Sequence, residues 1–176
     1  MLVLVGPSAC GKTRIVQQLI KQYGMEKLVT YTSRSKRVNE VEGKDYHFIT
    51  KDEFIKKIDE NFFIEYVNYN GNYYGTPRSE LSENKVVILE PNGLKHYLEK
   101  ARDLITIVYL KCSKEVLRIR MLNRHDAKED VERRLKEDSM RFTPEIMNLA
   151  DLVIDTTPSN IYDDAKAIYS FYKRQK

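Results

Sequence analysis

Cysteine is scarce in this sequence, and long apolar runs are missing. The two cysteines among 176 residues, Cys10 and Cys112, lie far apart and form no cluster with metal-ligand spacing, so we interpret both as small reduced residues. No apolar run approaches the roughly 20 residues that cross a bilayer. Residues 1–5 continue directly into a glycine loop instead of a signal peptide. These absences predict a cytoplasmic protein without a membrane partner.

The sequence has no strong excess of charge of either sign, only a small excess of positive charge. Thirty lysines and arginines against 26 acids give a formal net charge of +4, and the two signs are interleaved along the chain. Because there is no basic stripe interleaved with aromatics, a nucleic-acid partner is not indicated. Apolar residues make up 41% of the chain, enough for one globular domain with a sizeable core. We expect a monomer or a homodimer.

The strongest positive signal lies near the start of the chain. Residues 6–13 read Gly-Pro-Ser-Ala-Cys-Gly-Lys-Thr and match the phosphate-binding pattern G-x-x-x-x-G-K-[ST] at every required position. An apolar run over residues 1–5 precedes this loop and predicts a buried strand. Apolar residues then recur at helical spacing up to Tyr23, and Gly24 provides a helix stop. This strand–loop–helix context predicts a nucleoside triphosphate site.

The chemistry of the loop follows from its geometry. Backbone N–H groups of a curled glycine loop point at one oxyanion, and the helix N-terminus adds unpaired donors. Lys12 is the predicted catalytic cation, within reach of the β- and γ-phosphates, and Thr13 is the predicted Mg²⁺ ligand. The residues predicted to surround the donor phosphates are Gly6, Pro7, Ser8, Ala9, Cys10, Gly11, Lys12 and Thr13.

Strand and helix patterns alternate through most of the remaining chain. Buried strands that alternate with helices predict an α/β fold, in which a parallel sheet lies between two helical layers. Ligands in such folds bind at the carboxyl ends of the strands. We assign this core to residues 1–30, 78–116 and 143–176 of a single domain spanning 1–176. Strands are expected near residues 85–90, 104–110 and 152–154, and helices near 93–102, 113–123, 131–141, 144–149 and 158–174.

Two segments depart from this alternation and are candidates for moving lids. Residues 31–77 form a small β-rich insertion for binding a nucleoside monophosphate, and residues 117–142 form a helical lid. Within the insertion, Asn70-Gly71 is a hairpin signal. Thr76 followed by Pro77 predicts the N-cap and first residue of a short helix that ends near residue 83. Strands are expected near residues 28–31, 46–49 and 62–69, and a helix near 51–58.

Several residues with phosphate- or base-binding chemistry lie in this insertion or at its end. Two arginines three residues apart, with tyrosines on neighbouring strands, suit a phosphate monoester because the planar guanidinium makes bidentate contacts. The set comprises Arg34, Arg37, Glu40, Tyr46, Glu65, Tyr74 and Thr76.

With these residues in place, the chain resembles the guanylate kinase family over nearly its whole length. The segment from Thr32 to Phe48 is highly specific to that family. The residues that carry the resemblance are 6–8, 11–13, 32–34, Arg37, 40–41, Gly43, 45–48, Glu65, 74–76, 86–89 and 133–135. The resemblance implies a P-loop kinase that transfers the γ-phosphate of ATP to GMP, with dGMP as a second acceptor.

The resemblance also implies roles for individual residues. Arg34, Arg37, Tyr46 and Tyr74 would hold the GMP phosphate, and Glu40 belongs to the same site. The guanine would face Thr30, Glu65, Thr76 and Glu90. Arg120 would bind the ATP phosphates from the lid, and Arg124 and Arg134 would join Lys12 as catalytic residues.

The chemistry of guanine agrees with the role of Glu65. Guanine presents adjacent N1–H and N2–H donors and an O6 acceptor, and an ionised carboxylate accepts both donors at once. The hydroxyl of Thr30 or Thr76 can donate to O6. Adenine lacks the N1–H, so the carboxylate would be left partly unpaired, which discriminates strongly in a dry site.

Other readings remain open because one stretch departs from the family pattern. The family usually carries Asp-Ile-Asp, then one residue, Gln and Gly after the second buried strand, where this chain has Glu90-Pro91-Asn92-Gly93. A P-loop kinase for another monophosphate is therefore one alternative. A non-catalytic binding module is a second, although such modules typically lose the loop lysine. A GTPase-like switch would need an Asn-Lys-x-Asp element, and the sequence has none.

Overall fold

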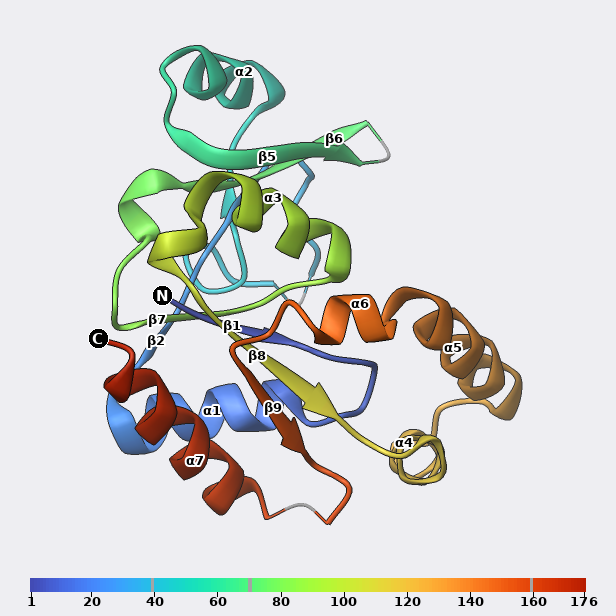
Figure 1. Ribbon diagram of the computed structural model, residues 1–176. Coiled ribbons are helices and arrows are strands. Elements are labelled where there is room, and N and C mark those ends of the chain that lie inside the picture. Colours follow the sequence, from blue (N-terminus) through green and yellow to red (C-terminus); the bar gives the residue numbers. More distant parts are fainter. Residues whose placement is uncertain (39, 70, 159) are drawn as a thin grey trace.

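A central sheet of five parallel strands organises the computed structural model, which describes residues 1–38, 40–69, 71–158 and 160–176 (Figure 1). The strand order is β2-β7-β1-β8-β9, and every neighbouring pair is parallel. This arrangement confirms the predicted sheet. The strands are β1 (Leu2–Val5), β2 (Glu26–Lys27), β7 (Lys85–Ile88), β8 (Thr106–Lys111) and β9 (Leu152–Asp155).

Helices cover both faces of this sheet, with α1 and α7 on one side and α3 and α6 on the other (Figure 1). All four residues of β1 are buried, because alternate side chains serve opposite faces. Leu2 and Leu4 belong to the cluster with α1 and α7, whereas Val3 and Val5 pack with α3 and α6. The helices are α1 (Lys12–Tyr23), α3 (Pro91–Ala101), α4 (Lys114–Leu122), α5 (Lys128–Arg141), α6 (Pro144–Met147) and α7 (Ile161–Arg174).

Helix ends follow the predicted signals. The backbone of Gly24 has a φ of +65°, and its N–H donates to the carbonyl of Ile20, which ends α1 as expected for a C-terminal glycine. The Ser113 hydroxyl accepts from the N–H of Val116 at 3.3 Å and caps α4. In the part of the chain that the structure describes, no helix combines the length and apolar character needed to cross a bilayer.

A second sheet of order β4-β3-β6-β5 lies within residues 31–77. Strands β5 and β6 form an antiparallel hairpin; Asn70 of the predicted turn lies outside the described residues. The predicted strand at 28–31 is largely wrong, because residues 28–30 connect β2 to β3 and only Tyr31 lies in a strand. The elements of this region are β3 (Tyr31–Thr32), β4 (His47–Phe48), α2 (Lys51–Asp59), β5 (Phe63–Tyr69) and β6 (Asn72–Pro77).

The short helix predicted from Thr76 to about residue 83 is wrong. Thr76 pairs with Glu65 and Pro77 with Phe63 in the β5–β6 ladder, and the 3₁₀ turn η1 (Arg78–Glu80) follows. Sheet pairing overrides the local capping signal, because Thr76 is β-branched and packs well in a strand. Pro77 is tolerated there because it ends the strand. A second 3₁₀ turn, η2 (Arg102–Leu104), leads into β8.

Candidate active site

The phosphate loop lies between β1 and α1, at the carboxyl end of the central strand of the parallel sheet. Gly6 has a φ of +155°, and a Cβ at this position would lie 2.5 Å from the carbonyl oxygen of Leu110. Only glycine allows the loop to pass this close to β8. Cys10 is fully buried beneath the loop, and burial raises the pKa of its thiol. This environment is that of a reduced core residue.

Lys12 crosses the inside of the loop. Its Nζ donates to the carbonyl of Gly6 at 2.5 Å and to that of Pro7 at 2.8 Å. Two backbone acceptors therefore fix the ammonium group of Lys12 beside the loop amides. Thr13 follows in the first turn of α1 with an exposed side chain, so its hydroxyl is available to a ligand.

An acid that the sequence analysis did not identify also contacts the loop. Asp138 of α5 is 9% exposed, and its Oδ2 accepts from the backbone N–H of Ser8 at 2.6 Å. Loop amides of this kind form the binding site for a phosphate oxyanion. Asp138 shares a helical face with the buried residues Val131 and Leu135, and this spacing was the available signal that it points inward.

A second set of hydrogen bonds ties the loop after β9 to the phosphate loop. Thr156 is fully buried, and its hydroxyl donates to the carbonyl of Cys10 at 2.9 Å. Arg120 of α4 donates to the carbonyl of Thr156 at 2.7 Å and to that of Ala9 at 3.4 Å. Arg120 is thus held between the two loops.

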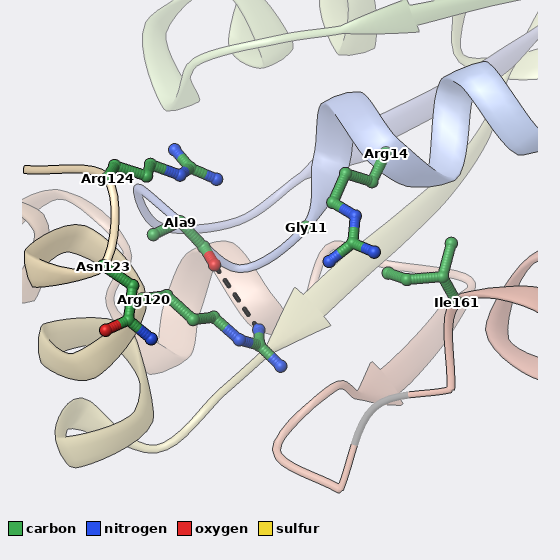
Figure 2. Close-up of a pocket in the computed structure, with 7 residues that line it drawn as sticks. All are labelled: Ala9, Gly11, Arg14, Arg120, Asn123, Arg124 and Ile161. Carbon is green, nitrogen blue, oxygen red and sulfur yellow. Dashed lines mark hydrogen bonds between the residues drawn. The ribbon is translucent and has the colours of Figure 1, made fainter.

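A pocket of about 260 Å³ opens beside the phosphate loop and is rich in arginine (Figure 2). Arg14 extends into it from α1, Arg120 from α4 and Arg124 from the turn that follows α4. Arg14 was missed by the sequence analysis, although its place directly after Thr13 put it at the mouth of the site. The pocket is lined by Ala9, Gly11, Arg14, Arg120, Asn123, Arg124 and Ile161.

The third predicted lid arginine lies elsewhere. Arg134 on α5 pairs with Asp126, its Nη1 lying 3.2 Å from Oδ2, and it does not line the arginine-rich pocket. The structure therefore brings Arg120 and Arg124 to the loop and leaves Arg134 paired with Asp126, within the same segment 117–142.

Arg34 lies at the centre of a cluster in the insertion. Its Nη2 lies 2.7 Å from Oε1 of Glu40, while Oε2 of Glu40 accepts from the backbone N–H of Arg37 at 2.8 Å. The hydrogen bond from Arg34 holds the pKa of Glu40 below its usual value. The guanidinium lies 5.7 Å from the ring centre of Tyr46, and the rings of Tyr46 and Tyr74 are 6.0 Å apart. The Arg37 side chain is exposed.

Glu65 lies on β5, next to the strand β6 that carries Tyr74. The hydroxyl groups of Thr76 and Tyr97 form a line of hydrogen bonds that leads to its carboxylate. Its Oε1 accepts from Thr76 Oγ1 at 2.6 Å, and Thr76 Oγ1 lies 2.6 Å from Tyr97 Oη of α3. Burial raises the pKa of Glu65, and the hydrogen bond from Thr76 opposes that rise. Thr30 is half-buried and Glu90 is exposed at the start of α3.

These features define a class of protein. A glycine loop at the end of the central parallel strand, with a lysine across it and arginines beside it, is the site of a small P-loop kinase fold. The sequence model described as guanylate kinase matches residues 1–168, and the chain belongs to the guanylate kinase family, a family of phosphotransferases.

Individual relatives agree with this membership. The guanylate kinase of Clostridium perfringens (strain SM101 / Type A) is 41% identical over 131 residues, which cover 70% of this chain. The match spans only 61% of that relative's length. The guanylate kinase of Prochlorococcus marinus (strain MIT 9312) is 30% identical over 175 residues, covering 96% of this chain and 94% of the relative.

Solved structures give the same fold. The crystal structure of guanylate kinase from Anaplasma phagocytophilum matches with a TM-score of 0.67 at 25% identity, covering 99% of this chain and 85% of the other. Shikimate kinase from Acinetobacter baumannii in complex with shikimate matches with a TM-score of 0.57 at 17% identity, covering 99% and 93%. At that identity, the second match concerns the fold alone.

Proposed function

We propose that the protein transfers the γ-phosphoryl group of ATP to GMP, giving ADP and GDP, and accepts dGMP as well. The proposal rests mainly on the half-buried carboxylate of Glu65, in a chain that keeps an intact phosphate loop with Lys12. A carboxylate that accepts two hydrogen bonds suits guanine among the common bases. The relatives named guanylate kinase support the same activity.

On the donor side, we assign the triphosphate to the loop amides and Lys12, and the rest of ATP to the arginine-rich pocket beside them. Arg120 and Arg124 neutralise charge on the transferred group. Arg134 joins them only if its pair with Asp126 opens, so we assign it to the closed lid. Direct in-line transfer needs no covalent intermediate, and catalysis consists mainly of positioning and electrostatic stabilisation.

On the acceptor side, Arg34, Tyr46 and Tyr74 bind the phosphate of GMP, and Arg37 reaches it from the surface. Glu40 orients Arg34 instead of touching the phosphate, since two anions repel. Thr76 directs its hydroxyl proton to Glu65. We therefore assign donation to guanine O6 to Thr30, one of the two hydroxyls that the sequence analysis left open, and place Glu90 at the rim of this site.

The residues present fit Mg²⁺ bound with the nucleotide. Among the described residues, no three His, Cys, Asp or Glu side chains gather into a metal cage, whereas Mg²⁺ usually keeps waters and substrate phosphates as ligands. The exposed hydroxyl of Thr13 is the protein ligand that this arrangement requires. Bound Mg²⁺ would neutralise charge on the β- and γ-phosphates.

We further propose that residues 31–77 and 117–142 act as two segments that close over the substrates. The first carries Glu65 and Arg34, and the second carries Arg120 and Arg124, so both kinds of site residue lie on elements outside the core sheet. Closure would exclude the water that would otherwise attack the γ-phosphate.

The contact between Asp138 and the phosphate loop predicts how a variant of Asp138 binds MgATP. A bound phosphate competes with its carboxylate for the N–H of Ser8. Asp138→Asn keeps an acceptor for that N–H but removes the negative charge, so we expect roughly tenfold tighter binding of MgATP, measured by calorimetry. Asp130→Asn is the matched control, because Asp130 is an acid on the same helix that pairs with Arg133 and not with the phosphate loop, so its replacement should leave the affinity unchanged. Unchanged or weaker binding in Asp138→Asn would contradict the competition.

A panel of acceptors tests the proposed reaction. With ATP and Mg²⁺, coupled ADP release should be rapid with GMP, slower but clear with dGMP, and near background with AMP, CMP and UMP. The reason is that only guanine offers Glu65 two adjacent donors. Equal rates across the panel would defeat the guanine assignment, a preference for another base would identify a different monophosphate kinase, and no turnover with any acceptor would indicate a binding module.

A further inference from the structure

Three oxygen atoms from three elements form one line of hydrogen bonds. Tyr97 Oη of α3 lies 2.6 Å from Thr76 Oγ1 of β6, which lies 2.6 Å from Glu65 Oε1 of β5. Tyr97 and Thr76 are each 1% exposed, whereas Glu65 is only half-buried. The line of hydrogen bonds therefore starts in the core and ends at Glu65, the most exposed of its three members.

The direction of the protons along this line is fixed by chemistry. An ionised carboxylate only accepts hydrogen bonds, so the single proton of the Thr76 hydroxyl points to Glu65. The Tyr97 hydroxyl must then donate to Thr76. Successive donors polarise one another in a low-dielectric interior, so Tyr97 strengthens the bond that Thr76 makes to the carboxylate.

Another buried tyrosine shows that this arrangement is not simply what a core tyrosine requires. Tyr172 of α7 is also 1% exposed, and its hydroxyl donates to the backbone carbonyl of Glu83 at 2.8 Å. A backbone carbonyl is therefore a sufficient partner for a buried tyrosine hydroxyl. The hydroxyl of Tyr97 instead donates to the hydroxyl of Thr76, which in turn donates to the carboxylate of Glu65.

We propose that Tyr97 is a positioning residue for substrate recognition, which acts through Thr76 to orient the Glu65 carboxylate and to keep it ionised. This inference rests on the proposed function, in which Glu65 binds the N1–H and N2–H donors of guanine. Oε1 retains a second lone pair beside the bond from Thr76, so the fixed carboxylate still presents both oxygens to the base.

The electrostatic surroundings of Glu65 make such support necessary. Burial raises its pKa, and the groups that oppose the rise are Thr76, His96 and Lys100. A protonated carboxyl group would donate where guanine also donates. Glu65 must therefore stay ionised to bind guanine, and the polarised hydroxyl of Thr76 favours that form.

Tyr97→Phe tests the proposal, because it removes one oxygen and keeps the ring. We expect KM for GMP to rise about fivefold, with kcat and KM for ATP little changed. The loss of kcat/KM for GMP on acidification should begin about 0.5 pH unit higher, since a less stabilised carboxylate protonates more readily. The preference for GMP over inosine monophosphate, which lacks the 2-amino group, should also fall.

Two variants serve as controls. Tyr172→Phe removes a buried tyrosine hydroxyl far from Glu65 in the chain and should lose a comparable amount of thermal stability without changing the kinetics for GMP. Thr76→Val removes the hydroxyl that joins Tyr97 to Glu65, so it should raise KM for GMP at least as much as Tyr97→Phe does.

A nucleotide-free measurement separates this inference from the proposed reaction. With ¹³C-labelled glutamate carboxyl groups, the NMR titration of Glu65 should move to higher pH in Tyr97→Phe and stay in place in Tyr172→Phe. An unmoved titration would overturn the hydrogen-bond relay, whatever the substrate is. A moved titration in a protein that does not phosphorylate GMP would refute the reaction and uphold the relay. Unchanged GMP kinetics in an active Tyr97→Phe variant would overturn the positioning role.

Discussion

Replacing Lys12 with alanine is expected to lower kcat by at least about a hundredfold while leaving the fold intact. The ammonium group lies inside the phosphate loop, bound to the carbonyls of Gly6 and Pro7. In the proposed reaction it would supply a full positive charge, which the neutral loop amides lack, next to the transferred phosphoryl group. Steady-state ADP release with saturating ATP and GMP measures the effect.

The matched control for this variant is Lys21→Ala. Lys21 lies in the last turn of the same helix with an exposed side chain, so its loss removes the same charge without touching the loop. Circular dichroism and a thermal melt should show a native fold for both variants. Turnover of Lys12→Ala at the level of the original protein would contradict the assignment of the loop as the donor site.

Replacing Glu65 with glutamine is expected to lower kcat/KM for GMP about a hundredfold, since a hydrogen bond to a charged group is lost in a partly buried site. The amide has nearly the same shape, but its NH₂ group faces a donor of the base where the carboxylate had accepted. Selectivity should fall together with the rate, so the ratio of the GMP and AMP values measures the effect better than either value alone.

Glu60→Gln is the control for Glu65→Gln. Glu60 is an exposed acid in the same insertion, 3.9 Å from Lys56, and its replacement changes the net charge equally. We expect its kinetics to match those of the original protein. A Glu65→Gln variant with unchanged preference for GMP would mean that another group binds the base.

The phosphate loop and the parallel sheet could be predicted because their signals are local. The loop motif occupies eight consecutive residues, and each core strand is a short apolar run that needs no partner to be recognised. The stop at Gly24 and the cap at Ser113 are equally local. The error at Thr76 arose where a local capping signal competed with pairing to a strand that lies earlier in the chain.

Asp138 and Tyr97 could not be found in this way because their roles depend on distant partners. Asp138 contacts Ser8 across 130 positions of the chain, and Tyr97 contacts Thr76 across 21. Helical spacing places both side chains on inward faces, but it does not say which polar group each one meets. Arg134 illustrates the reverse case, since its match to a family pattern did not reveal the nearby acid that pairs with it.

The bonds that join Thr156 to Cys10 and Arg120 to both loops have a consequence for how tightly nucleotide can bind. They restrain the phosphate loop and Thr156, directly after β9, relative to each other. The conformational entropy of this region is therefore lost once, when the chain folds, and is not lost again in each catalytic cycle. Thr156→Val removes the hydrogen bond to Cys10, so the phosphate loop of this variant should become ordered only when nucleotide binds. Its weaker affinity for nucleotide would then reflect the entropy of ordering the loop more than lost contacts.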